Sequence, residues 1–346
     1  PELAAQWKAY HEGSLPEDFA GDPDFWDFQD KTATRSASGA VLNRLAGKGL
    51  NLFGGSADLA PSNKTVLSGR GEFGKDNYAG GNVHFGVREM AMAAACNGIA
   101  LYGGLRPFCS TFFVFSDYLK PALRLSALMK LPVLYILTHD SIGVGEDGPT
   151  HQPIEQLAGL RAMPNAMVFR PADGKETAAG YLAALSAHGP AVLVLSRQNL
   201  PLYEKTGKEA MRGGYILKDT EGEPDVILMA SGSEVDVICG AEALLRAKGL
   251  AARLVSMPCF SLFDAQDEAY KESVLPRSVR ARVAVEAGSS FGWAKYTGFS
   301  GKTVTLDHFG ASAPAGILFE KFGFTPEHVA EEALRVVEKV RQEEKN

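Results

Sequence analysis

The sequence predicts an α/β protein with two consecutive open, mostly parallel sheets, each flanked by helices. Three observations lead to this fold class. Short apolar runs of strand length alternate with helical segments along most of the chain, which is the pattern of parallel sheets with right-handed crossovers. The chain has 346 residues, enough for two domains. A polar, glycine-rich segment at 206–224 divides the pattern and is expected to be a linker.

The first part of the pattern predicts a domain at 32–205. Its clearest element is the apolar run VLYIL at 133–137, which is typical of a strand buried on both faces. In chain order we expect strands at 50–53, 83–86, 106–113, 133–137, 166–169 and 191–195, and helices at 36–45, 89–100, 117–130 and 177–188. Residues 1–31 lack sustained periodicity after a short helix, so we expect a linker or docking arm there.

A second α/β pattern predicts another domain at 225–346. Strands are expected at 226–230, 252–257, 280–285 and 303–306, with a helix at 233–247 that Gly249 closes. The chain ends in a helix for which Thr325 is the expected cap and Pro326 the first residue.

Composition excludes several classes of protein. The fractions of hydrophobic (45%) and charged (22%) residues are those of an ordinary globular protein. The net charge is −6 and no run of Lys and Arg occurs, so we expect no nucleic-acid partner. No apolar run approaches the ~20 residues of a membrane span, and the N-terminus lacks the apolar core of a signal peptide. Because the chain begins with Pro1, we expect that an initiator Met was removed or that sequence precedes it. Four widely spaced cysteines in apolar surroundings favour buried thiols and a cytoplasmic location over zinc or disulfides.

The strand at 133–137 runs into a glycine-rich loop that carries many titratable groups. His139, Asp140, Glu146, Asp147 and His151 all lie in it. Ligands of parallel sheets bind just past the carboxyl ends of strands, so the loop is a candidate site. The alternative is a solvated acidic turn with two surface histidines. The loop also matches the GxGxxG dinucleotide pattern at 143–148, but two of its residues are acidic and would repel a pyrophosphate, so we reject that match.

Three further groups of residues are candidates for binding. Basic and hydroxylic residues recur at predicted strand ends and would suit a phosphate, although the arginines could instead pair with surface carboxylates. Aromatic residues at three-residue spacing could form core or could wall a flat heteroaromatic ring. A glutamate at the start of the apolar helix gains from the helix dipole, or, if buried, could share a proton with a ring nitrogen. The basic and hydroxylic residues are Arg35, Ser62, His139 and Arg197. The aromatic residues are Phe112, Phe115 and Tyr118, and the glutamate is Glu89.

Several motifs together resemble the transketolases, thiamine-diphosphate enzymes of the pentose phosphate pathway. They are GGSADLAPSN, GVRE, STFFVFSDY, THDSIGVGEDGPTHQP, SRQNLP and GSEV. The resemblance runs from about residue 32 to the C-terminus, and it implies a pyrimidine-binding domain followed by the family's C-terminal domain. Transketolases also carry an N-terminal diphosphate-binding domain whose GDG…N segment holds Mg²⁺, and Gly21-Asp22-Pro23 is not such a segment.

The resemblance therefore implies one subunit of a split transketolase, or the remnant of a longer chain. The expected partner is a diphosphate-binding subunit or domain that holds Mg²⁺ or Ca²⁺, in a homodimer or heterotetramer, and this chain is expected to hold no metal. The expected reaction moves a two-carbon ketol unit from a ketose phosphate to an aldose phosphate through thiamine diphosphate, and the chain alone is expected to be inactive.

The resemblance also implies a role for each candidate residue. Glu89 would hydrogen-bond the pyrimidine ring nitrogen and favour the imino tautomer, whose nitrogen takes a proton from the thiazolium carbon. Asp147 would recognise a substrate hydroxyl by a hydrogen bond, and His151 would assist proton transfer. The remaining residues would pack around the pyrimidine (Phe112, Phe115, Tyr118), lie near the thiazolium (Asp58) or grip the sugar phosphate (Arg35, Ser62, His139, Arg197).

Three alternatives stay open at this point. The β subunit of a 2-oxo-acid dehydrogenase has the same two-domain size. Its substrate is unphosphorylated, however, so the set of Arg35, Ser62, His139 and Arg197 would have no phosphate to bind. Dihydroxyacetone synthase shares most of the motifs. The chain could also be a non-catalytic dimerisation fragment.

Overall fold

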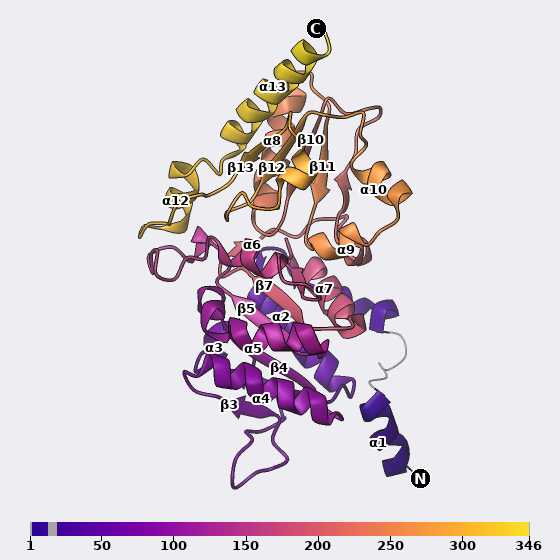
Figure 1. The fold of residues 1–346 in the computed structure, drawn as a ribbon, viewed down its shortest axis with the longest axis vertical. Helices are drawn as coiled ribbons and strands as arrows, with labels where there is room; N and C mark the ends of the chain where they lie inside the picture. The colour runs from indigo at the N-terminus through magenta and orange to yellow at the C-terminus, as the bar shows by residue number, and fades with distance from the viewer. Residues whose placement is uncertain (1, 13–18, 346) are drawn as a thin grey trace.

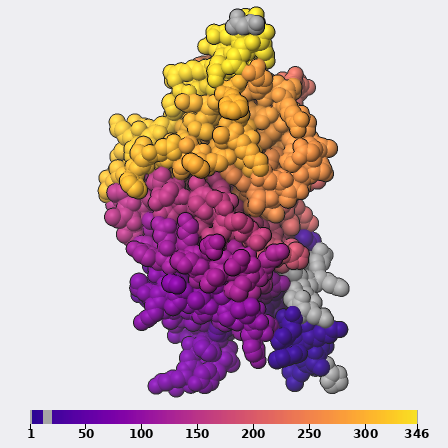
Figure 2. Space-filling view, viewed as in Figure 1, coloured from indigo at the N-terminus to yellow at the C-terminus, as the bar shows by residue number. Residues whose placement is uncertain are grey.

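The computed structural model describes residues 2–12 and 19–345, and the chain forms two α/β domains stacked end to end (Figure 1). The N-terminus lies at the far end of the first domain and the C-terminus at the far end of the second. The domains pack against each other over a broad face (Figure 2). Residues 1, 13–18 and 346 lie outside the description, so part of the arm expected at 1–31 does too; within that arm are α1 (Glu2–Glu12), η1 (Phe19–Gly21) and η2 (Pro23–Trp26).

The first domain is built on a six-stranded parallel sheet of order β3-β2-β4-β5-β7-β6. Its strands are β2 (Leu52–Ser56), β3 (Asn82–His84), β4 (Arg106–Phe112), β5 (Leu134–Thr138), β6 (Met167–Phe169) and β7 (Ala191–Leu195). A two-residue strand, β1 (Thr32–Ala33), pairs antiparallel with β8 (Asn199–Leu200) beside the sheet. Every residue of the central strand β5 is buried, as the continuous apolar run predicted.

Helices cover both faces of this sheet because successive side chains of β5 point to opposite faces. Leu134 and Ile136 pack with α2 (Thr34–Gly47) and α7 (Gly174–Ser186), whereas Tyr135 and Leu137 pack with α4 (Glu89–Tyr102) and α5 (Ser116–Met129). Four short elements complete the domain: α3 (Ala60–Asn63), η3 (Phe113–Phe115), η4 (Ile142–Val144) and α6 (Gln156–Arg161).

The second domain is built on a five-stranded sheet of order β13-β12-β10-β11-β9, in which β9 alone is antiparallel to its neighbour. Its strands are β9 (Tyr215–Lys218), β10 (Val226–Ala230), β11 (Ala252–Ser256), β12 (Arg282–Val285) and β13 (Lys302–Val304). The long helices α8 (Glu234–Ala247) and α13 (Pro326–Glu343) cover one face. The shorter elements are η5 (Lys208–Arg212), α9 (Phe260–Asp264), α10 (Glu268–Val274), α11 (Ala294–Thr297) and α12 (Ala315–Lys321).

The predicted fold class is confirmed, with local differences. The segment 206–224, expected to be a linker, contains η5 and the edge strand β9, whose Tyr215 and Leu217 are buried. The strand expected at 106–113 ends one residue earlier, because η3 begins at Phe113. Thr325 caps α13 as predicted, since its side chain accepts a hydrogen bond from the backbone N–H of His328. In the described part of the chain, no helix has the length and apolar character needed to traverse a bilayer.

Candidate active site

The candidate site forms along one edge of the first sheet, where the parallel strands end. Asp58 follows β2, Phe112 ends β4, His139 follows β5 and Arg197 follows β7. Asp58 and His139 both adopt a left-handed backbone conformation, with φ of 61° and 64°. Such values are uncommon for residues with a side chain and are held only where surrounding contacts fix them.

An aromatic cluster lines this edge. The Phe112 ring stacks on the His139 imidazole with 3.7 Å between ring centroids. The ring centroid of Phe115 lies 6.0 Å from that of Phe112 and 6.1 Å from that of Tyr118. The ring of His151 stands edge-on to Phe115, with 5.5 Å between their centroids. Because the ring of Tyr118 is 64% exposed, the cluster is open to the surface. These rings provide apolar faces against which a planar heterocycle can pack.

The protonation state of His139 follows from its hydrogen bonds. Thr138 Oγ1 donates to Asn63 Oδ1 at 2.7 Å, so it can only accept from Nδ1 of His139, at 2.8 Å. Nε2 lies 3.5 Å from Nη1 of Arg35, and because a guanidinium group can only donate, Nε2 is the acceptor and carries no proton. Burial, together with the charges of Arg35 and Arg197, lowers the pKa of His139 from 6.5 to about 3. The imidazole is therefore neutral at pH 7.

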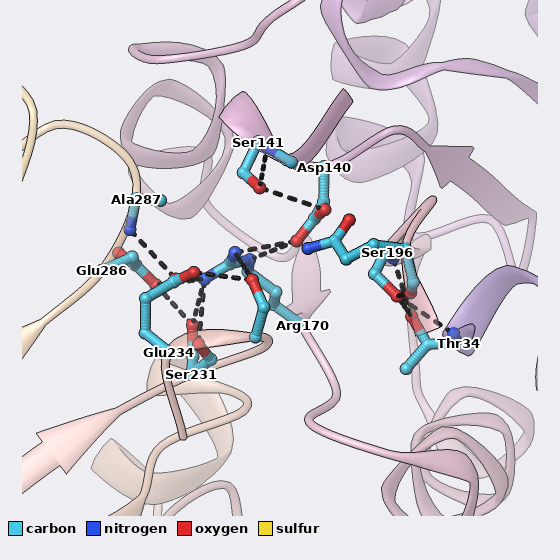
Figure 3. A network of polar contacts seen from close by, with 12 residues as sticks. Thr34, Asp140, Ser141, Arg170, Ser196, Ser231, Glu234, Glu286 and Ala287 are labelled. Atoms are coloured by element: carbon cyan, nitrogen blue, oxygen red, sulfur yellow. Dashed lines mark hydrogen bonds and ion pairs between the residues drawn. The ribbon is translucent and has the colours of Figure 1, made fainter. Parts of the chain in front are cut away.

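Arg35 and Arg197 are brought together by a pair of hydrogen-bonded neighbours, Thr34 and Ser196. The Thr34 N–H donates to Ser196 Oγ at 3.0 Å, and the Ser196 N–H donates to Thr34 Oγ1 at 2.7 Å (Figure 3). This exchange ties the start of α2 to the end of β7. The next residue on each segment is an arginine, so the two guanidinium groups emerge close to each other. Sequence reasoning missed this pair, although SRQNLP contains one of its members.

The two arginines carry positive charge that no carboxylate of the described residues neutralises. Neither forms an ion pair with a carboxylate in the described part of the chain, so the alternative of surface pairing does not hold there. Nη1 of Arg35 donates to the main-chain oxygen of Ser62 at 3.0 Å, and its buried Nε has no hydrogen-bond partner among the described residues. Burial and the charge of Arg197 lower the pKa of Arg35. A pair of arginines beside a neutral imidazole is an arrangement suited to an anion.

Glu89 lies beside β4, the strand that ends at Phe112 of the aromatic cluster. It is the first residue of α4, and only 8% of its surface is exposed. Its Oε1 accepts a long hydrogen bond of 3.5 Å from Thr111 Oγ1, and Thr111 precedes Phe112 on β4. A buried carboxyl group of this kind is chemically able to share a hydrogen bond with a ring nitrogen.

Two predicted site residues stand apart from this group. Asp58 and Asp147 are exposed, and within residues 2–12 and 19–345 their carboxylates form no hydrogen bond or ion pair with the other candidates. Asp147 lies in the loop after η4, where no phosphate-binding helix follows: the next helix, α6, begins only at Gln156. This supports the rejection of the GxGxxG match. Nor does the described chain contain a group of three or more His, Cys, Asp or Glu side chains placed to hold a metal ion.

The structure also contains a buried ion network between the domains that the sequence did not predict (Figure 3). Arg170, which follows β6, binds the carboxylates of Asp140 in the first domain and Glu234 in the second. Arg161 binds Glu286 through two hydrogen bonds of 2.6 and 2.8 Å. Asp140, one of the carboxylates in the candidate loop, is therefore already paired. The motif GSEV, which includes Glu234, was the one available signal of this network.

Comparisons with known proteins agree along nearly the whole chain. The family model for the transketolase pyrimidine binding domain matches residues 30–202, and the model for the transketolase-like C-terminal domain matches residues 213–325. The transketolase of Halalkalibacterium halodurans is 53% identical over 343 residues, which are 98% of this chain and 52% of that protein. The chain thus spans about half the length of the curated relatives it matches.

Two solved structures are similar in fold. A Pichia stipitis transketolase in complex with sedoheptulose-7-phosphate has a TM-score of 0.93 and 42% sequence identity, over 99% of this chain and 51% of that one. A split-gene transketolase, described as an inactive β4 tetramer, has a TM-score of 0.72 and 26% identity, over 88% of this chain and 98% of that one. The match thus takes in nearly all of the second structure's chain but only about half of the first.

Proposed function

This chain belongs to the transketolase family, and on that premise we propose that it supplies one half of a thiamine-diphosphate active site. The proposed half binds the pyrimidine ring and the sugar phosphate. A separate domain or subunit supplies the other half, which holds the diphosphate and its Mg²⁺ or Ca²⁺. The proposed reaction transfers a two-carbon ketol unit from a ketose phosphate to an aldose phosphate, as in the pentose phosphate pathway.

The observation that carries this proposal is the pair of arginines beside His139, next to the aromatic cluster, which form no ion pair with a carboxylate in the described part of the chain. A phosphate on the sugar would accept hydrogen bonds from both guanidinium groups, and Ser62 would add a hydroxyl. An unphosphorylated oxo acid would leave these charges unused, so the site favours transketolase chemistry over that of a 2-oxo-acid dehydrogenase. The sugar phosphate bound to the Pichia stipitis relative supports the same class of substrate.

The residues present fit the ring of the cofactor. Glu89 is buried and has no cationic partner in the described chain, so it is available to hold a ring nitrogen. Phe112, Phe115 and Tyr118 would pack around the ring, and Asp58 would lie near the thiazolium. When bound, thiamine diphosphate supplies the electron sink for the cleaved ketose.

Two loop residues are proposed to act on the substrate. His151 stands edge-on to Phe115, and its Nδ1 lies 2.9 Å from Thr150 Oγ1, which fixes the orientation of the ring. In this position it could move a proton at the reacting centre. Asp147 is exposed, so it could accept a hydrogen bond from a substrate hydroxyl once the cleft is complete.

An exposed apolar surface on α4 and α5 supports the need for a partner. Large apolar side chains that a monomer would normally bury are exposed there: Met90, Leu101, Tyr102, Tyr118, Leu125, Leu128 and Met129. Met90 directly follows Glu89 at the start of α4, and Tyr118 belongs to the aromatic cluster. A protein that covers this surface would therefore also close the candidate site. We propose a homodimer or heterotetramer in the reducing cytoplasm, where the four free thiols would stay reduced.

The test is a complementation assay. Ketol transfer from a ketose phosphate is measured for the purified chain alone, then with the part of the Halalkalibacterium halodurans transketolase that this chain does not match, in the presence of Mg²⁺ and thiamine diphosphate. We expect no transfer and weak cofactor binding by the chain alone, and transfer on mixing. Robust transfer by the chain alone would refute the division of the site. Absence of transfer on mixing, with binding intact, would favour a non-catalytic fragment.

A further inference from the structure

The second domain uses the carboxyl edge of its sheet in an unusual way. In open α/β sheets, ligands bind outside the carboxyl ends of the strands. Here Glu234 follows β10 and Glu286 follows β12. The carboxylate of Glu234 binds Arg170 of the first domain (Figure 3), and that of Glu286 binds Arg161, also of the first domain. This edge therefore serves as a docking surface for two guanidinium groups.

Arg170 connects the two domains through both sides of its guanidinium group. On one side Nη2 and Nε lie 2.8 and 2.9 Å from Asp140 Oδ2. On the other side Nη1 donates to the main-chain oxygen of Ser231 at 2.9 Å and binds Glu234. Glu234 is itself fixed, because it accepts a hydrogen bond of 2.9 Å from the Ala287 N–H.

The network is buried, so its geometry is strongly constrained. Only 1% of Arg170 is exposed. Burial lowers the pKa of Arg170, but the charges of Glu234, Asp140 and Glu286 outweigh it and raise the pKa overall. Moving Arg170 away from Asp140 would leave a buried carboxylate without its cation, which is costly.

Asp140 is covalently bonded to His139, whose backbone has a φ of 64°. That conformation is held from two sides. On one side Thr138 Oγ1 accepts a hydrogen bond from the imidazole, and on the other the carboxylate of Asp140 is clamped by Arg170. Loss of the clamp would free the backbone at the residue that faces Arg35.

The second domain also holds the far end of the candidate loop. Nε2 of Gln152 donates to the main-chain oxygens of Gly145 and Ala311, both at 2.9 Å. The hydroxyl of Ser312 donates to the main-chain oxygen of Glu146 at 2.5 Å. The loop between His139 and His151 is thus anchored to the second domain at both ends.

We infer that Arg170 is a positioning residue through which the second domain sets the place and orientation of the His139 imidazole. The inference rests on the proposed function only where it describes His139 as part of a phosphate site. In this role the second domain is a rigid support for the loop between His139 and His151 in the first domain.

The test compares Arg170→Lys with a matched control, Arg161→Lys. Lysine keeps the charge but cannot reach Asp140 and Glu234 at once. Arg161 also bridges the domains, but it binds Glu286 and does not touch Asp140. Nitrogen NMR of the imidazole gives the readout. Wild-type His139 should show a single neutral tautomer with the proton on Nδ1; Arg170→Lys should give mixed tautomers, and Arg161→Lys the wild-type signal.

Titration with inorganic phosphate gives a second readout. We expect its affinity to fall about tenfold or more in Arg170→Lys, as when a charged hydrogen bond is lost, and to change less than about twofold in Arg161→Lys. Unchanged imidazole signals in Arg170→Lys, or equal changes in both variants, would overturn the inference. If Arg170→Lys does not fold, Asp140→Asn provides the same comparison, because it keeps the size of the side chain and removes the charge that Arg170 binds.

The outcomes separate this inference from the proposed function. A changed imidazole signal together with no ketol transfer in the complementation assay would refute the proposed function alone. An unchanged imidazole signal together with ketol transfer would refute the positioning role alone.

Discussion

Acidification should destabilise the folded chain through His139. In the folded chain the imidazole has a pKa of about 3, against an ordinary value of 6.5, because it is buried near Arg35 and Arg197. Below pH 6.5, therefore, the imidazole binds a proton in the unfolded chain but not in the folded chain. The contribution of His139 to stability is complete above pH 6.5, and it is lost progressively as the pH falls toward the pKa of the folded chain.

The magnitude follows from the difference in proton binding. Each pH unit below the ordinary pKa of 6.5 changes the free energy of unfolding by about 1.4 kcal/mol, so about 2 kcal/mol is lost by about pH 5. His139→Asn removes this contribution. Asparagine cannot titrate, and it tolerates the left-handed backbone at this position better than most residues.

The assay is urea unfolding of the wild-type chain and His139→Asn at about pH 8 and about pH 5. Phosphate and sulfate are left out of the buffer, because an anion beside His139 would favour its charged form. The stability of the wild type relative to the variant should fall by about 2 kcal/mol between the two pH values. If the relative stability is the same at both pH values, the folded chain takes up the proton normally. That result would refute the assignment of a neutral imidazole facing Arg35.

Three further predictions concern the carboxylate, the phosphate site and the core. Glu89→Ala should lower ketol transfer of the complemented enzyme by about 100-fold or more, with an unchanged circular dichroism spectrum; retained turnover would show that the cofactor is activated in another way. Arg197→Met should raise KM for the phosphorylated substrate about tenfold with little change in kcat, whereas Arg277→Met, at an exposed arginine of the second domain, should change neither; equal KM values would exclude Arg197 from the phosphate site. Ile136→Ala should lower the free energy of unfolding by about 2–5 kcal/mol, measured in urea, because the side chain is fully buried; a loss below about 1 kcal/mol would mean that the core collapses around the cavity.

Most elements of the fold could be predicted from the sequence because their signals are local. The run at 133–137 is apolar throughout, since β5 is covered by helices on both faces. The cap at Thr325 is likewise a short-range pattern. The edge strand β9 was missed because it is only four residues long and lies in a polar, glycine-rich segment, although Tyr215 and Leu217 are buried on one face and Ile216 is half-buried on the other.

Part of the candidate site could also be predicted, for a geometric reason. Parallel strands end at a common edge, so residues that follow β5 and β7 must lie near one another. This places His139 and Arg197 together without knowledge of any side-chain contact. Asp58 and Asp147 also follow this rule, but their contacts with substrate or cofactor remain predictions, because a partner or ligand must complete them.

By itself the sequence determined the alternation of strands and helices, the family, and the edge of the sheet on which the candidate residues gather, since each depends on residues close together in the chain or on the general geometry of parallel sheets. Only the tertiary structure decided which of those residues are free to act. Arg170 binds both Asp140 and Glu234, which lies far along the chain in another domain. Arg35 and Arg197 form no ion pair with a carboxylate among residues 2–12 and 19–345. Charge pairing and desolvation depend on which segments pack together, and no local pattern encodes that packing.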